Sequence, residues 1–165
     1  MSVSRRTVLG GLGAGLVASA VWPRNGMSAG NSALDTSQLI YLTPMMMGGK
    51  KESRCHGEVW FVHRGGEVFV VTQHDAWRAE AVRKGLDQAT IWVGEFGPWK
   101  SANERYREAP RMRLSGRLET DPKVHADLLE DFGAKYAAEW GKWGPRFQKG
   151  LAGGSRVMLR YQVQN

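Results

Sequence analysis

Cysteine is nearly absent from this chain, and so are long apolar runs. Cys55 is the single cysteine among 165 residues, which excludes an internal disulfide. The longest mostly apolar stretch, residues 8–21, is glycine-rich and shorter than the roughly 20 residues that a membrane-spanning helix needs. The chain also lacks a Cys-x-x-Cys-His haem-attachment motif and a basic, aromatic-interleaved motif, so nothing predicts nucleic acid as a partner. Stability must therefore come from a packed core.

The N-terminus has the pattern of an export signal. A paired arginine at residues 5–6 opens an apolar run that ends in small residues at 18–20. This pattern predicts a twin-arginine signal peptide over residues 1–20, cleaved after Ala20, with the twin-arginine export machinery as a partner. That route carries folded proteins that have often taken up a cofactor, so we expect a periplasmic protein with a redox cofactor. The alternative is a Sec signal or an anchor that contains two arginines by chance.

The rest of the chain has the size of one domain. Residues 21–37 are rich in Gly, Ser, Ala and Asn, which predicts a linker, and the folded domain is expected over residues 38–165. The net charge is +7, or about +5 without the two arginines of the leader. Basic residues crowd into residues 100–117. They can attract a phosphate or another anion, although such a pattern is more typical of a solvated loop and strand face.

Apolar alternation predicts strands and one well-defined hairpin. Residues 38–43 have the pattern of a first strand, which Pro44 ends. Two β-branched and aromatic runs, residues 59–63 and 68–72, flank Gly65-Gly66, and these glycines can supply the positive φ angles of a tight turn. Both faces of this hairpin are apolar, so both must be buried, as in a small barrel with something packed outside it. Further strands are expected at residues 90–94, 111–120 and 155–163.

Two helices are expected beside these strands. The first covers residues 76–84 and ends at Gly85, with Arg78 among its outward residues. The second begins at Thr120-Asp121-Pro122, an oxygen cap followed by proline near the first turn, and its apolar stripe continues until Gly141 and Gly144-Pro145 break it. Because this order of elements lacks the βαβ rhythm, the predicted fold is mainly β with peripheral helices (α+β), an antiparallel split β-barrel.

The irregular stretch at residues 95–109 and the aromatic residues are weighed separately. Trp99 and Tyr106 lie in that stretch and are candidates for a ligand lid. Trp140 and Trp143 can wall a ring-shaped ligand, but core packing is the default for Trp140.

The chain resembles the flavin-binding split-barrel superfamily, which includes pyridoxamine-phosphate oxidase and the deazaflavin-dependent nitroreductases. The resemblance is carried by the hairpin at residues 58–72, by Thr72-Gln73, by the tryptophan-led helix at residues 77–85 and by the strand at residues 88–93. It covers roughly residues 38–163.

The resemblance implies an oxidoreductase that binds flavin mononucleotide (FMN) or deazaflavin in a groove of a homodimer. Hydride would pass from the reduced ring to a small-molecule substrate such as a quinone, an enone or a nitro compound. No protein acid or base for this step is evident. The residues that match the family's cofactor-phosphate segments are Lys50, Lys51, Ser53, Arg54, Thr72, Gln73, Trp77 and Arg78.

Several alternatives stay open. Glu52 adds a carboxylate to the segment expected to hold an anion, so a split barrel without a cofactor, serving as a ligand-binding or structural module, is one alternative. A periplasmic haem-binding or copper-binding protein is another. Thioether, thiolate and imidazole ligands suit copper(I), and the chain offers Met45, Met46, Met47, Cys55, His56, His63 and His74. Their spacing matches no known metal signature, and we expect His63, beside the hairpin turn, to be exposed.

Replacing Lys50, Lys51 and Arg54 together by alanine tests the first phosphate segment. If these cations grip the cofactor phosphate, the triple variant should retain less cofactor, because charge-assisted hydrogen bonds offset the cost of removing a dianion from water. The measurement is the amount of cofactor released from purified protein by denaturation. Unchanged retention would remove these residues from the site.

Overall fold

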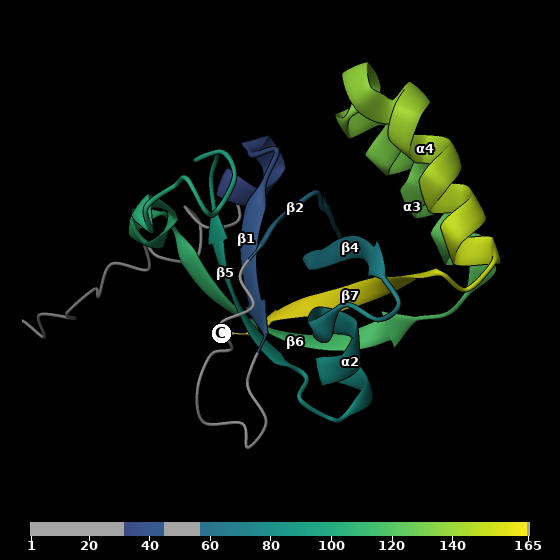
Figure 1. The fold of residues 1–165 in the computed structure, drawn as a ribbon, viewed down its shortest axis with the longest axis horizontal. Coiled ribbons are helices and arrows are strands. Elements are labelled where there is room, and N and C mark those ends of the chain that lie inside the picture. The colour runs from purple at the N-terminus through teal and green to yellow at the C-terminus, as the bar shows by residue number, and fades with distance from the viewer. Residues whose placement is uncertain (1–31, 45–56, 165) are drawn as a thin grey trace, which may run out of the picture.

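Seven strands form one antiparallel sheet that curls on itself (Figure 1). The computed structural model describes residues 32–44 and 57–164. The strand order is β2-β1-β5-β6-β7-β4-β3. The strands are β1 (Ile40–Pro44), β2 (Gly57–Val59), β3 (Val62–Arg64), β4 (Glu67–Gln73), β5 (Gln88–Val93), β6 (Arg111–Glu119) and β7 (Arg156–Gln164). The helices are α2 (Trp77–Arg83), the 3-10 helix η1 (Arg105–Glu108), α3 (Pro122–Lys135) and α4 (Ala137–Ala152). The predicted α+β split barrel is confirmed.

The predicted hairpin is confirmed, and both of its faces are buried. Gly65 and Gly66 both have positive φ, at 60° and 79°, and join β3 to β4. Val68 and Val70 face the barrel interior, whereas Phe69 and Val71 belong to a second core beneath α3 and α4. The helical pair α3–α4 lies on the outer face of the sheet, so it is the element that covers the outside of the hairpin (Figure 1).

The folded part begins earlier than we expected. Residues 32–36 form a helical turn, and Leu34 is fully buried in the interior core. Residues 32–37, which the composition assigned to the linker, therefore belong to the folded domain. The burial of Leu34 in the core outweighs the small, polar composition of its neighbours. In the described ranges no helix is both long and apolar enough to cross a membrane.

The two edges of the sheet are joined by the chain itself. Strands β2 and β3 lie at opposite edges, yet only Trp60 and Phe61 separate them in sequence. Three Cα steps reach about 10 Å at most, so the edges must lie close together and the sheet must curl. Continued two positions beyond the pair of Ile40 with Val59, the register of β1 with β2 would place Gln38 opposite Phe61.

The hydroxyl of Tyr136 takes the place of that missing backbone pair. The N–H of Phe61 donates to this hydroxyl at 2.8 Å, and the carbonyl oxygens of Gln38 and Phe61 both lie 2.9 Å from the hydroxyl, whose single proton can be donated to either of them. Tyr136 stacks on Trp60 at 4.2 Å between ring centroids. Burial raises the pKa of Tyr136, so the phenol keeps its proton. One side chain thus satisfies the backbone where the two edges meet.

The long helix breaks at Tyr136, not at Gly141 or Gly144-Pro145 as expected. Its start is as predicted, because the Asp121 carboxylate accepts from the Lys123 N–H at 2.8 Å. The expectation treated the later glycines and proline as helix breakers, but Pro145 lies inside α4.

The glycines have a packing role instead. A Cβ at Gly133 or at Gly144 would lie 2.8 or 2.7 Å from the Trp140 ring. Gly133 and Gly144 thus make room for the Trp140 ring between α3 and α4. Trp140 packs against the core there, as we expected by default from the sequence.

Replacing Tyr136 by phenylalanine should lower the free energy of unfolding by about 1–3 kcal/mol, because buried backbone groups lose their partner. Urea unfolding gives the value. Tyr161→Phe is the matched control, since the Tyr161 hydroxyl is buried but has no hydrogen-bond partner in the part of the chain that the structure describes. Its stability should be kept or rise. Equal losses in both variants would contradict the role given to Tyr136.

Candidate functional site

Arg78 points into the end of the barrel instead of outward. Its Nη1 donates to the Thr72 hydroxyl at 3.0 Å, and Thr72 is buried with 3% of its surface exposed. The expectation that Arg78 faces solvent is wrong, because Ala79 and Ala81 bury the inner side of the short helix α2 and leave space for a long side chain. Gly57 also makes room, since a Cβ there would lie 2.8 Å from Arg78 Nη2.

Two buried hydrogen-bond donors at this end of the barrel, Arg78 Nε and the Tyr161 hydroxyl, have no partner among the residues that the structure describes. The same holds for Trp77 Nε1, which lies on the same helix as Arg78. Arg78 and Trp77 belong to α2, and the Arg78 charge acts on the pKa of Tyr161, which places the guanidinium near the phenol. Arginine Nε and indole Nε1 only donate, so a group that satisfies this set must accept hydrogen bonds. Unpaired buried donors are rare and call for an explanation.

Tyr161 is the site residue that the sequence did not reveal. It is fully buried in the interior core, and its ring packs against Gly116 of the neighbouring strand. Burial raises its pKa, and the Arg78 charge only partly opposes this shift. The sequence held a signal for this residue. Tyr161 lies two residues after Leu159 on the same apolar face of the strand, and a phenol buried on such a face needs a hydrogen-bond partner for its hydroxyl.

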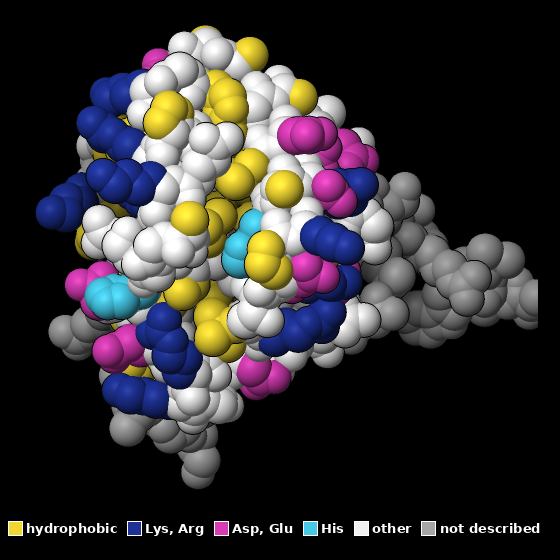
Figure 2. Space-filling view, turned by 90° about the vertical axis from the view of Figure 1, so that its right-hand side faces the viewer, with side chains coloured by type: hydrophobic (Ala, Val, Ile, Leu, Met, Phe, Trp, Pro, Cys, Tyr) yellow, Lys and Arg dark blue, Asp and Glu magenta, His cyan; other side chains and the backbone are white. Residues whose placement is uncertain are grey.

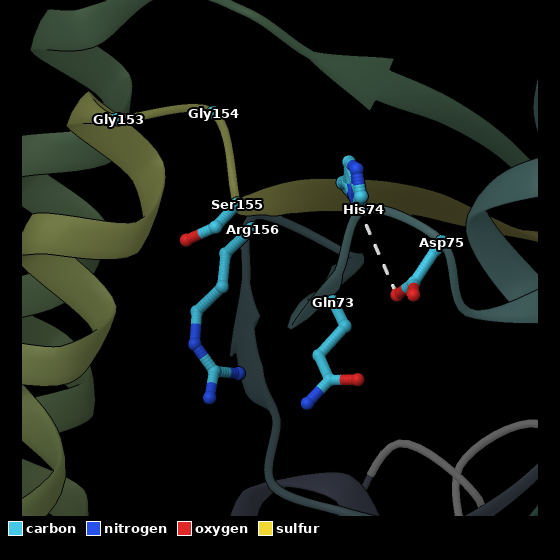
Figure 3. Close-up of a pocket in the computed structure, with 7 residues that line it drawn as sticks. All are labelled: Gln73, His74, Asp75, Gly153, Gly154, Ser155 and Arg156. Atoms are coloured by element: carbon cyan, nitrogen blue, oxygen red, sulfur yellow. Dashed lines mark ion pairs between the residues drawn. The ribbon is translucent and has the colours of Figure 1, made fainter.

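Gln73 lies in a different place from Thr72. Successive residues of a strand point to opposite faces, so Thr72 faces the barrel interior and Gln73 faces outward. Gln73 pairs with Arg156 across β4 and β7, and the two side chains extend in the same direction beside the turn that links α4 to β7 (Figure 3). They line an open crevice of about 490 Å³ together with His74, Asp75, Gly153, Gly154 and Ser155.

The structure therefore brings together Thr72 and Arg78, with Trp77 on the same helix, and leaves Gln73 apart. The other predicted phosphate residues, Lys50, Lys51, Ser53 and Arg54, lie outside the described residues. The same holds for the candidate copper ligands Met45, Met46, Met47, Cys55 and His56.

The described histidines are engaged in other contacts. His63 Nδ1 lies 2.7 Å from an Asp35 carboxylate oxygen, and its side chain is 12% exposed, so the expectation that it is exposed is wrong. His125 Nε2 lies 2.8 Å from the Glu119 carbonyl oxygen, and His74 is on the surface near Asp75. Across residues 32–44 and 57–164, no three His, Cys, Asp or Glu side chains are grouped to hold a metal ion.

Tyr106 is a core residue, not part of a lid. It is 1% exposed and stacks on Tyr41 at 4.6 Å between ring centroids. Trp99 is partly buried against the same cluster. The irregular stretch looked free in the sequence because it has no period, but its aromatic residues cover the outer face of β1 and β5.

A second pocket lies between the start of the domain and α3. Its volume is about 570 Å³, and Asp35, His63 and Lys135 are among the residues that line it. The Lys135 ammonium lies 3.5 Å from the centroid of the Phe61 ring. Burial lowers the pKa of Lys135 to about 8, although the charges of Asp35 and Glu95 oppose this shift.

Comparison with known proteins identifies the fold. No family model matches the chain, and no curated protein matches it. Solved structures do. A candidate pyridoxamine 5'-phosphate oxidase from Listeria innocua matches with a TM-score of 0.53 and 16% identity, over 82% of this chain and 90% of that one. The haem storage protein HutZ from Vibrio cholerae matches with a TM-score of 0.54 and 15% identity, over 82% and 87%. An F420 reductase matches with a TM-score of 0.50 and 13% identity, over 82% and 93%.

These likenesses place the chain in the split-barrel fold. These structural neighbours are named as a candidate pyridoxamine 5'-phosphate oxidase, a haem storage protein and an F420 reductase. Identities of 16% or less show the fold alone. The chemistry of the site must therefore be argued from the residues of this chain.

Replacing Lys135 by methionine should raise stability at pH 7, with a gain that shrinks toward pH 10.5. The pKa of Lys135 is lower in the folded state than its ordinary value of 10.5, so the unfolded chain binds more protons between pH 8 and pH 10.5. Wild-type stability then gains from Lys135 as the pH rises through this window. Urea unfolding at several pH values measures the difference, with Lys142→Met on the exposed side of α4 as the control. A gain independent of pH would contradict the shift.

Proposed function

We propose that this domain is an oxidoreductase that binds a phosphate-bearing flavin or deazaflavin with the end of the barrel around Arg78. The observation that carries the proposal is the set of buried donors on Trp77, Arg78 and Tyr161 that find no partner within residues 32–44 and 57–164. A phosphate accepts several hydrogen bonds and carries the charge that a half-buried guanidinium favours. The residues present therefore fit the phosphate end of such a cofactor.

Each of the three donors has a separate part in this proposal. Arg78 neutralises the phosphate charge and is held in place by its hydrogen bond to Thr72. Trp77 and Tyr161 add neutral donors that cost little when an acceptor arrives, because burial has already removed them from water. When bound, the reduced ring would supply a hydride for a quinone, an enone or a nitro compound.

Export and assembly belong to the same proposal. The paired arginine at residues 5–6 supports transfer of a folded, cofactor-loaded protein to the periplasm. A homodimer is proposed from the resemblance to the flavin-binding split barrels. A periplasmic protein of this kind needs an electron donor in that compartment.

A haem protein is the second candidate, since one structural neighbour is named as a haem storage protein. Haem iron needs an axial ligand, most often a histidine. Among the described residues, His125 Nε2 contacts a carbonyl oxygen, and His63 contacts Asp35 through Nδ1 while its buried Nε2 has no partner there. The guanidinium of Arg78, bonded to the buried Thr72, favours the phosphate-bearing cofactor over haem.

The visible spectrum of the purified protein and the mass of any released molecule test the proposal. A yellow preparation that releases a molecule with the mass of FMN or of a deazaflavin supports it. A Soret band would support haem. A colourless protein that also fails to bind added FMN and added deazaflavin would overturn the proposal in favour of a cofactor-free module.

Two substitutions test the donors directly. Arg78→Met should weaken FMN binding by about tenfold or more, since a hydrogen bond to a charged group contributes about 1.5–3 kcal/mol. Tyr161→Phe should weaken it by a smaller factor while stability is kept or rises. Arg105→Met, at an exposed position of η1, is the matched control and should bind as the wild type does. Fluorescence titration with FMN gives the dissociation constants, and wild-type affinity in Arg78→Met would remove Arg78 from the site.

A further inference from the structure

Helix α4 presents a row of positive charges that the proposed cofactor site does not use. Lys142, Arg146 and Lys149 are all exposed and follow one another at positions i, i+4 and i+7, so they lie on one narrow face of the helix. We call these three residues the α4 basic ridge. Over the described part of the chain, no ion pair joins any of the three to a carboxylate.

The upper part of one edge on this side of the molecule is mainly basic. Figure 2 looks onto the side that carries α3 and α4 and shows Lys and Arg side chains one above another along the upper left edge, whereas acidic and basic side chains are mixed on the right and at the lower left. The exposed acids of α3 include Asp127 and Glu130. Glu139 is the one acidic residue of α4, in its first turn. The ridge therefore offers an almost uniform positive surface.

An aromatic side chain lies beside the ridge. The Trp143 ring is partly exposed, with Lys142 Nζ 5.6 Å and the Arg146 guanidinium carbon 5.1 Å from its centroid. Tryptophan next to basic residues is typical of surfaces that meet the headgroup region of a bilayer.

A protein partner is less well matched to this surface. Protein interfaces bury an apolar core of large side chains, whereas the large apolar side chain Phe147 of α4 is buried in the domain. The exposed apolar residues of α4 are small, apart from the partly exposed tryptophans.

We propose that the α4 basic ridge docks the domain onto a membrane surface rich in anionic phospholipid. Basic residues near an anionic bilayer are attracted individually, and the attraction falls off within a Debye length. With three cations and one aromatic edge, docking is reversible and salt-dependent. It would hold an exported reductase beside lipid-dissolved substrates such as quinones, and in this respect it rests on the proposed function.

Vesicle sedimentation with the chain as isolated from expressing cells tests the proposal. The triple variant Lys142→Gln, Arg146→Gln, Lys149→Gln should bind vesicles containing phosphatidylglycerol at least tenfold more weakly than wild type at low salt. The control triple variant Lys100→Gln, Arg105→Gln, Arg113→Gln removes the same charge from exposed positions elsewhere and should bind as wild type does. Because the N-terminal residues are the same in all three proteins, any contribution from them cancels in the comparison.

Three outcomes would overturn the proposal. One is equal loss in both triple variants, which would mean that net charge alone drives binding. Another is equal binding to pure phosphatidylcholine vesicles. The third is an α4 triple variant that binds vesicles as wild type does but no longer binds an acidic protein or a soluble polyanion. FMN titration of the same variants separates this proposal from the previous one, because the α4 variant should keep wild-type cofactor affinity whether or not it binds vesicles.

Discussion

The hydroxyl group of Tyr136 is the contact on which the rest of the domain depends. It bonds the backbone of Phe61, where the chain passes from one edge of the sheet to the other, and the carbonyl of Gln38 just before β1. The same residue ends α3 and begins α4. A single phenol therefore sets the curl of the sheet, the start of the first strand and the position of the helical pair, so these parts should form cooperatively.

The candidate site lies at the end of this curled sheet. Small residues shape it, because Gly57 and Gly116 leave space for the Arg78 guanidinium and the Tyr161 ring. Buried donors without partners normally destabilise a fold. Their concentration around Arg78 is the kind of local cost that proteins bear where a ligand binds.

Local features were predictable from the sequence, and long-range ones were not. The turn at Gly65-Gly66 and the start of α3 at Asp121 depend on backbone preferences of a few residues, and both predictions hold. The break at Tyr136 and the inward Arg78 depend on partners 75 residues and six residues away, respectively. The spacing of apolar residues predicts which face of a helix or strand a residue occupies, but not which distant group will be its hydrogen-bond partner. For this reason only part of the candidate phosphate site could be predicted from the sequence. Thr72 and Arg78 are close together in sequence, whereas Tyr161 comes from the last strand.

The passage of the chain between β2 and β3 also bears on self-association. An exposed sheet edge is a template on which another copy can add a strand. Here each edge strand has three residues, and the two edges are tethered to each other by Trp60 and Phe61. Neither edge can extend or peel away without displacing the other. Connectivity, together with the short edge strands and their charged residues Glu58 and Arg64, thus limits the growth of intermolecular β-structure.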